Sequence, residues 1–523
     1  MSHAIGIDVG TTNVKVALVS DGGAIVASAS RGLASRRDDG AAEQDAEAVW
    51  GAVLDAVAEA TAAAPTAAAD VAAICVCSQY SSIVPVDARG APVAPMTLYW
   101  DHRGTARSWQ VLERHPEALG IFLEHHGIPP IGSGLSLGHI LSFQHDRPDV
   151  HAATAAYLEP MDYVNARLTG TIAATQCTMF MSQVCDNRTV GTTEYDAELV
   201  RLSGVDPTRL PRLLPVDGVV GEVLPDVAAR IGVRPGVTVH AAMNDSHAGA
   251  FAAGVFAPGR GGLAIGTTAV LLDTVDDKRA DLEAELVSMP SPIPGRYLAW
   301  AENGIAGKAV EHVLEHVVYA VDELADHFSD DFFAALDSGL AASPPGSHGV
   351  LFLPWLAGSM APSANARMRG AFVNLSLETR RTDLVRSMVE GTALNVGWLL
   401  PAVERFTGQR IEEVAFFGGA ARSTGWAQIL ADVLGRPVLA LRDPDRAVAR
   451  AMGLVALERS GLLGGDVSSL VDVGATYDPR AEHRTTYRVA QEQFVAAFDA
   501  LRPINEALGS PVAGDGAQEG STP

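Results

Sequence analysis

The stretch that decides the fold lies at the N-terminus and reads Ala4-Ile5-Gly6-Ile7-Asp8-Val9-Gly10-Thr11-Thr12-Asn13-Val14-Lys15-Val16-Ala17-Leu18-Val19. Two short apolar runs rich in β-branched residues flank a tight polar segment, and this pattern predicts a strand, a turn and a second strand. Gly10 allows backbone N–H groups to approach a phosphate closely, and Thr11 and Thr12 add hydroxyl donors. Asp8, at the mouth of the first strand, has the chemistry to hold Mg²⁺ directly or through water. An ordinary hairpin would explain this stretch alone equally well.

A second copy of the pattern lies about half a chain downstream and reads Gly262-Leu263-Ala264-Ile265-Gly266-Thr267-Thr268-Ala269-Val270-Leu271-Leu272-Asp273. Both copies carry Gly-Thr-Thr, one further residue and Val. Two related strand-turn-strand units predict an internally duplicated architecture of two α/β domains, each directing one turn at a shared cleft. Two such turns facing one polyphosphate are typical of a kinase.

Composition restricts the class of protein further. The 523 residues are too many for one ordinary core, so two large domains are expected. The net charge of −24 predicts that the surface repels nucleic acid and anionic membranes. The four cysteines fit neither a zinc site nor a disulfide framework, and no apolar run is long enough to cross a bilayer, so we expect a reducing cytoplasm. Lysines are scarce, which makes Lys15 a candidate phosphate contact; a solvated strand end is the alternative.

Four further segments combine strand ends with polar or small residues. In chain order they are Gln79-Tyr80-Ser81 after a strand over 71–77, Asp101-His102-Arg103 after Tyr99-Trp100, Asn244-Asp245 after a strand over 237–241, and Gly418-Gly419-Ala420 with Ser423 after a strand over 414–417.

With the two Gly-Thr-Thr turns, these segments resemble, in order and over about residues 4–460, the motifs of the FGGY carbohydrate kinases, most closely the xylulokinase-like branch. The resemblance implies two duplicated ribonuclease H-like (actin-like ATPase) domains around a central cleft. It also implies ATP and Mg²⁺ as cofactors, and a homodimer is left open. We expect an N-terminal domain over 1–248 and a C-terminal domain over 249–506. The composition of 507–523 predicts a disordered tail.

Asp245 falls on the position of the family's general base. A sugar hydroxyl is a poor nucleophile, and a carboxylate within hydrogen-bond reach takes its proton as the bond to the γ-phosphorus forms. A cap for the helix that follows is the alternative role.

The resemblance implies that the sugar contacts Gln79, Tyr80, Ser81, Asp101, Asn244 and Asp245. The family often has Met-His where this chain has Tyr80 and Ser81. A serine donates and accepts hydrogen bonds but does not titrate near neutrality, so the pocket should still bind hydroxyls with a different shape. For Asp101, a structural pair with Arg103 is the alternative.

The nucleotide is expected between the two Gly-Thr-Thr turns. By the resemblance, Gly418, Gly419, Ala420 and Ser423 take the adenosine, since a turn without Cβ atoms admits a flat base. A small-residue helix is predicted over 447–457 on the nucleotide side.

We therefore expect ATP-dependent phosphorylation of a small sugar or polyol, with a ketopentose such as D-xylulose as the leading substrate. Another pentulose, polyol or sugar acid is the nearer alternative. A non-catalytic, nucleotide-gated sugar-binding member of the superfamily is the more distant one.

Overall fold

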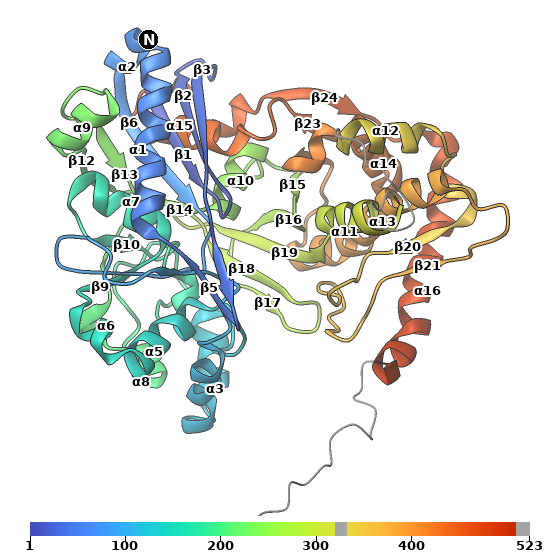
Figure 1. Ribbon diagram of the computed structural model, residues 1–523, viewed down its shortest axis with the longest axis horizontal. Helices are drawn as coiled ribbons and strands as arrows, with labels where there is room; N and C mark the ends of the chain where they lie inside the picture. Colours follow the sequence, from blue (N-terminus) through green and yellow to red (C-terminus); the bar gives the residue numbers. More distant parts are fainter. Residues whose placement is uncertain (319–331, 509–523) are drawn as a thin grey trace, which may run out of the picture.

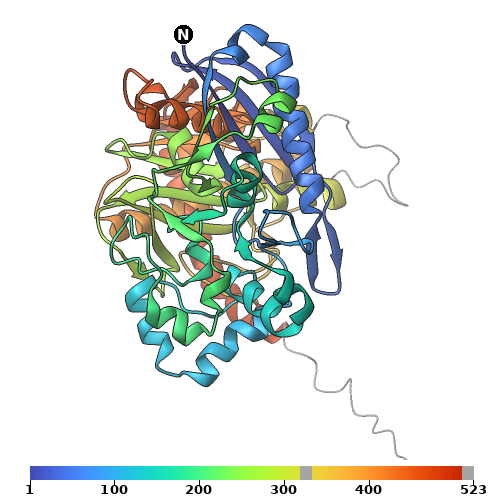
Figure 2. The same ribbon diagram turned by 90° about the vertical axis from the view of Figure 1, so that its left-hand side faces the viewer.

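The computed structural model describes residues 1–318 and 332–508 (Figures 1 and 2). The first two residues of the predicted tail end helix α16 (Arg484–Leu508), and residues 509–523 lie outside the described residues. None of the described helices combines the length and apolar character needed to span a bilayer.

Seven strands form the N-terminal sheet, in the order β12-β13-β6-β1-β2-β3, with β14 beside β6. Their bounds are β1 His3–Val9, β2 Asn13–Ser20, β3 Ile25–Gly32, β6 Val71–Ser78, β12 Val219–Glu222, β13 Thr238–His240 and β14 Met243–Asn244. Strand β1 is antiparallel to β2 and parallel to β6, and β2 is antiparallel to β3. The predicted first strand-turn-strand unit is confirmed, with Val9 opposite Val14 at the turn.

Eight strands form the C-terminal sheet, in the order β17-β18-β19-β16-β15-β22-β23-β24. Their bounds are β15 Arg260–Ile265, β16 Thr268–Val275, β17 Ala280–Asp281, β18 Leu286–Pro290, β19 Tyr297–Ile305, β22 Glu413–Phe417, β23 Val438–Leu441 and β24 Val473–Tyr477. The central run β19-β16-β15-β22-β23 repeats β3-β2-β1-β6-β13 strand for strand and with the same relative directions. The predicted duplication is therefore present in the topology.

Each sheet is covered on one face by helices of its own half. Helix α1 (Ala46–Ala63) buries Val49, Val53 and Val57 at helical spacing against the face of the N-terminal sheet that carries Ile5 and Ile7. Helices α13 (Arg381–Thr407) and α14 (Thr424–Leu434) cover the corresponding face of the C-terminal sheet.

The other faces meet in the middle of the molecule through an exchange of helices. Helix α15 (Ala447–Arg459) comes from the C-terminal half but packs on β1, β2 and β6, next to which Figure 1 shows it. Helix α10 (Asp245–Ala253) packs against α15 and β15. The contact is tight, because a Cβ added to Gly6 would lie 1.8 Å from the Ala449 carbonyl oxygen. The small residues of α15 thus serve to join the halves.

A satellite of short helices lies at the lower left of Figure 1, around an apolar cluster of its own. Its main members are α3 (Thr105–Arg114), α5 (Ser136–Asp146), α6 (Pro148–Ala153) and α8 (Ala197–Ser203). A small sheet of β4 (Arg36–Asp38), β5 (Ala41–Gln44) and β8 (Met96–Thr97) connects the satellite to the first sheet.

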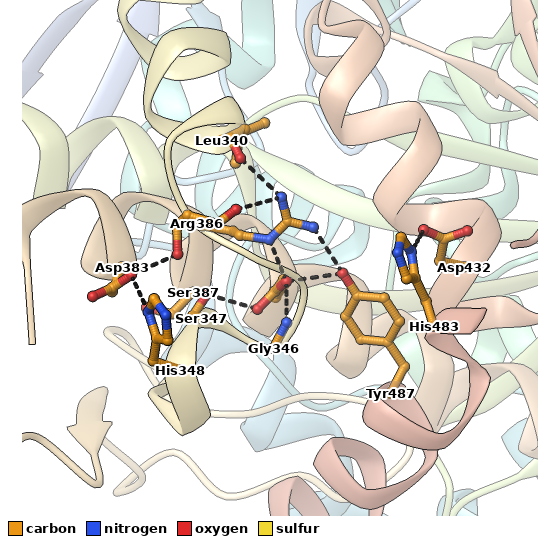
Figure 3. A network of polar contacts seen from close by, with 12 residues as sticks. Leu340, Gly346, Ser347, His348, Asp383, Arg386, Ser387, Asp432, His483 and Tyr487 are labelled. Carbon is orange, nitrogen blue, oxygen red and sulfur yellow. Dashed lines mark hydrogen bonds and ion pairs between the residues drawn. The ribbon is translucent and has the colours of Figure 1, made fainter.

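A buried polar network fastens α16 to the C-terminal core (Figure 3). Arg386 on α13 donates from Nε to Glu390 Oε1 at 2.7 Å and from Nη2 to the Tyr487 hydroxyl at 3.0 Å. Its Nη1 donates to the carbonyl oxygens of Leu340 and Ser343, at the end of and just beyond α12 (Phe332–Ala341). Four segments therefore share one guanidinium.

Candidate functional site

Each Gly-Thr-Thr turn is closed by a hydrogen bond from its glycine, across three residues in the first turn and two in the second. The N–H of Gly10 donates to the Asn13 carbonyl at 3.0 Å, and the N–H of Gly266 donates to the Thr268 carbonyl at 2.9 Å. A Cβ at Gly266 would meet nothing within 4 Å, so backbone is open to a ligand there. Thr12 and Thr267 are exposed.

Both turns border one cavity of about 330 Å³ between the two sheets. The N-terminal half contributes Thr11, Gln79, Tyr80, Ser81, Tyr99, Ser133, Gly134, Met181, Asp245 and Ser246, and the C-terminal half contributes Thr268, Val270, Trp300 and Glu302. The structure therefore brings together a threonine from each turn, three of the expected sugar contacts and the expected base.

Asp245 is the first residue of α10, and its side chain is open to the cavity. The helix is capped by Asn244 instead, whose Oδ1 accepts from the His247 N–H at 2.9 Å. Burial of the site by the surrounding protein, together with the charges of Asp8 and Glu302, raises the pKa of Asp245 to about 7. A carboxyl with this pKa is suited to accept a proton near neutral pH.

Asp8 is the penultimate residue of β1 and lies on the same side of the sheet as its strand partners Lys15 and Cys77. The Cys77 thiol lies 3.7 Å from Asp8 Oδ1 and can donate to it. Burial raises the pKa of Asp8, and the nearby Lys15 opposes that rise. The described residues contain no cluster of three or more acidic, His or Cys side chains arranged for a metal. A Mg²⁺ ion that arrives with nucleotide phosphates needs only one or two carboxylates, so the position of Asp8 fits it.

Gln79 joins the cavity to the first turn. Its Oε1 accepts from the Thr11 hydroxyl at 2.6 Å, and its backbone N–H donates to the Val9 carbonyl. Gln44, which the sequence did not single out, donates from Nε2 to the Thr11 carbonyl at 2.6 Å. The substrate side and the phosphate side of the site are thus held by one set of hydrogen bonds.

Tyr80 and Ser81, the two departures from the family pattern, both line the cavity. Burial raises the pKa of Tyr80, which shares a hydrogen bond with Ser246. Ser81 has a φ of 57°, a left-handed conformation that non-glycine residues seldom adopt outside turns and functional sites. Tyr99 also borders the cavity and hydrogen-bonds with Thr11.

Asp101 lies elsewhere, outside the lining of this cavity. Its buried carboxylate accepts from the N–H of Ala42 at 2.8 Å, and from the N–H and Nη2 of Arg103 at 2.9 and 2.6 Å. Burial opposes them, but these hydrogen bonds hold the pKa of Asp101 below its usual value. These bonds favour the structural alternative for Asp101, and its contact with a sugar stays a prediction.

Asn244 and Ser423 also direct their side chains into the protein. Asn244 is fully buried as the cap of α10. Ser423 caps α14, accepting from the Trp426 N–H at 3.0 Å and donating to Asp337 Oδ1 at 2.5 Å. Both side chains serve as helix caps, and their contacts with the sugar and the nucleotide stay predictions.

The Gly418-Gly419-Ala420 turn follows β22, which is parallel to β15 and so ends beside the second Gly-Thr-Thr turn. Gly418 has a φ of 88°, and a Cβ there would lie 2.8 Å from the Ile265 carbonyl oxygen. Gly419 faces open space, and Ala420 is buried. The geometry leaves room for a flat group against Gly419.

Sequence reasoning missed Trp300 and Glu302 on β19. Residues two apart on a strand share a face, and both side chains are half-buried between buried neighbours. Glu302 hydrogen-bonds with Thr268 of the second turn, and burial raises its pKa. A charged residue inside a mainly apolar strand was the available signal.

Comparison with known proteins gives a consistent result. The models of the N-terminal and C-terminal domains of the FGGY family of carbohydrate kinases match residues 3–252 and 262–457. A xylulose kinase of Bacillus subtilis is 24% identical over 517 residues, which cover 98% of this chain and 99% of that protein. A gluconokinase of the same species is 23% identical over 538 residues, covering 96% and 99%.

The solved structures to which this chain is similar agree with the family models. The crystal structure of xylulose kinase from Rhodospirillum rubrum superposes with a TM-score of 0.80 and 26% identity, covering 96% of this chain and all of that one. The predicted architecture of two duplicated actin-like ATPase domains around a cleft is confirmed. The chain belongs to the FGGY family of carbohydrate kinases.

Proposed function

We propose that this enzyme transfers the γ-phosphoryl group of ATP to a hydroxyl of a small sugar or polyol, with a ketopentose such as D-xylulose as the first candidate. One observation carries the proposal: Asp245 borders the same cavity as Thr11 and Thr268, one threonine from each phosphate turn. The xylulose kinases among its relatives supply the substrate class.

In the proposed reaction, Asp245 holds the acceptor hydroxyl and takes its proton. The sugar oxygen forms its bond to the γ-phosphorus while the bond from that phosphorus to the bridging oxygen of ADP breaks. Because Asp245 must be ionised to accept a proton, its pKa of about 7 leaves it available at neutral and higher pH.

The phosphates would lie between the two turns, against the backbone of Gly10 and Gly266 and the threonines that follow each. Bound Mg²⁺ would neutralise charge on the phosphates, with Asp8 as its protein partner and Lys15 adding positive charge beside Asp8. The open space beside Gly419 supports adenosine binding there. Closure of the two halves would exclude water, which otherwise wastes ATP by hydrolysis.

A sugar acid is the second candidate acceptor, because a gluconokinase is also among the relatives. A non-catalytic sugar-binding role is disfavoured by the exposed, cavity-facing carboxylate of Asp245.

The test is ADP formation from ATP and Mg²⁺ with a panel of pentuloses, pentitols, tetritols and aldonates. We expect sugar-dependent ADP release that is largest with a ketopentose. Sugar binding without ADP release from any member would identify the non-catalytic role, and neither binding nor release would refute the proposal.

A further inference from the structure

Glu302 reaches the substrate cavity from the domain opposite Asp245. It lies on β19, where its backbone partner on β16 is Val270, and both side chains border the cavity together with Trp300. The hydrogen bond between Glu302 and Thr268 fixes the carboxylate beside the second phosphate turn. Glu302 is thus part of the wall that a bound substrate would face across from the base.

The charged residues that line the cavity are all acidic. Among the described residues that line it, two are acidic, Asp245 and Glu302, and none is Lys, Arg or His. The charge of Glu302 acts on Asp245, Tyr80 and Tyr99. The remaining polar lining consists of hydroxyls and the Gln79 carboxamide.

We propose that Glu302 is a specificity-determining residue, which makes the acceptor site select uncharged ketoses and polyols and reject sugar acids. Its carboxylate accepts hydrogen bonds from neutral hydroxyls. A carboxylate on the substrate would instead meet two like charges, with no cation among the described lining residues to pair with. Like charges brought together in a partly desolvated site repel strongly. The inference rests on the proposed function and decides between its two candidate acceptors.

Phosphoryl transfer does not require Glu302, so its carboxylate is available to select the substrate. Asp245 is committed as the base and Asp8 as the partner of Mg²⁺, and a kinase for either acceptor needs both. Glu302 has neither role. Among the described residues Glu302 has no ion-pair partner. Its hydrogen bond is with the neutral side chain of Thr268, so no cation is paired with its carboxylate.

The experiment compares D-xylulose with D-xylonate, a sugar acid with the same number of carbons, as substrates and as competing ligands. The readouts are kcat/KM for each and the inhibition constant of xylonate against xylulose. They are measured for the wild type, Glu302→Gln and Glu302→Asp. Glutamine keeps an oxygen that accepts from Thr268 but removes the charge, whereas aspartate keeps the charge. Glu283→Gln is the matched control, since Glu283 is an exposed glutamate of the same domain outside the cavity.

We expect the wild type to prefer xylulose by about 100-fold or more, and Glu302→Gln to tighten xylonate inhibition by about tenfold. Glu302→Asp and Glu283→Gln should retain the wild-type discrimination. Equal use of both compounds by the wild type, or an equal response of Glu302→Gln and Glu283→Gln, would overturn the assignment of Glu302 alone. Absence of ADP formation with every neutral sugar and every acid would remove the proposed function and this inference with it.

Discussion

Two groups of carboxylates in this molecule differ in their partners: one group is buried and paired in the C-terminal core, and the other borders the cavity. In the C-terminal core, Glu390 is bonded to Arg386 and Tyr487, and Asp432 to Arg480 and His483. In the cavity, Asp245 and Glu302 form no ion pair with any described residue, and burial raises the pKa of both. For Asp432, hydrogen bonds from Arg480 and His483 outweigh burial and lower the pKa.

The difference distinguishes carboxylates that stabilise the fold from carboxylates that serve the reaction. A buried charge is tolerated when a partner compensates it, and the pair then holds segments together. A carboxylate left uncompensated in a cavity is costly for folding, and is retained where its basicity or charge serves a reaction. The predictions below test this division, beginning with the largest expected effect.

The largest effect is expected for Asp245→Asn. The amide keeps the size of the side chain at the start of α10 but accepts no proton, so kcat should fall by about 10³-fold while ATP binding persists. The measurement is steady-state ADP formation, together with nucleotide affinity by calorimetry. Because Asn244 caps the helix, the thermal stability of the variant should be retained. Turnover near that of the wild type would remove Asp245 from the role of base.

Arg386→Met should have the next largest effect, and on stability instead of chemistry. It leaves Glu390 buried without its cation and frees the carbonyl groups that it holds, which should cost about 3 kcal/mol in the free energy of unfolding. Urea denaturation measures this cost. The activity per folded molecule should change little.

Two variants on α16 calibrate that result. Tyr487→Phe removes only the hydroxyl of the network and should cost about 1 kcal/mol. Arg488→Met breaks an exposed pair with Glu492 and should cost less than about 0.5 kcal/mol. Similar losses for all three variants would contradict the view that burial of the network determines its contribution.

The parts of the fold that could be predicted from sequence are those that depend on residues close together in the chain. The Gly-Thr-Thr turns lie between short runs of mostly buried apolar residues, so their strands follow from local pattern. The repeat of the motif revealed the duplication. The small residues of α15 predicted a helix. They did not reveal that it packs across the molecule on β1, because that contact joins Gly6 to Ala449 over most of the chain length.

The site was predictable where a strand end carries its polar residue directly into the cavity, as with Gln79 and Asp245. The site was not predictable where a backbone group far away in the sequence determines the hydrogen bonds of a side chain. Asp101 looked like a sugar contact beside its aromatic neighbours, but the N–H of Ala42, from another strand, completes its hydrogen bonding. Glu302 lies within an ordinary strand, and only the fold shows that this strand faces Asp245.

The smallest predicted effect concerns pH and links the two cavity carboxylates. Asp245 works as a base only when ionised, so kcat/KM should fall by about tenfold per pH unit below its pKa of about 7 and be fully present above it. The charge of Glu302 contributes to the raised pKa of Asp245, after burial and the charge of Asp8. Glu302→Gln should therefore move the acid limb to lower pH, by less than about one unit. The sugar and ATP ionise in the same way in the assays of both enzymes. A displacement between the two pH profiles of kcat/KM therefore comes from the protein. An acid limb that stays in place would mean that the two carboxylates do not interact across the cavity. The charge of Glu302 would then be compensated, as the charges of the paired carboxylates in the core are.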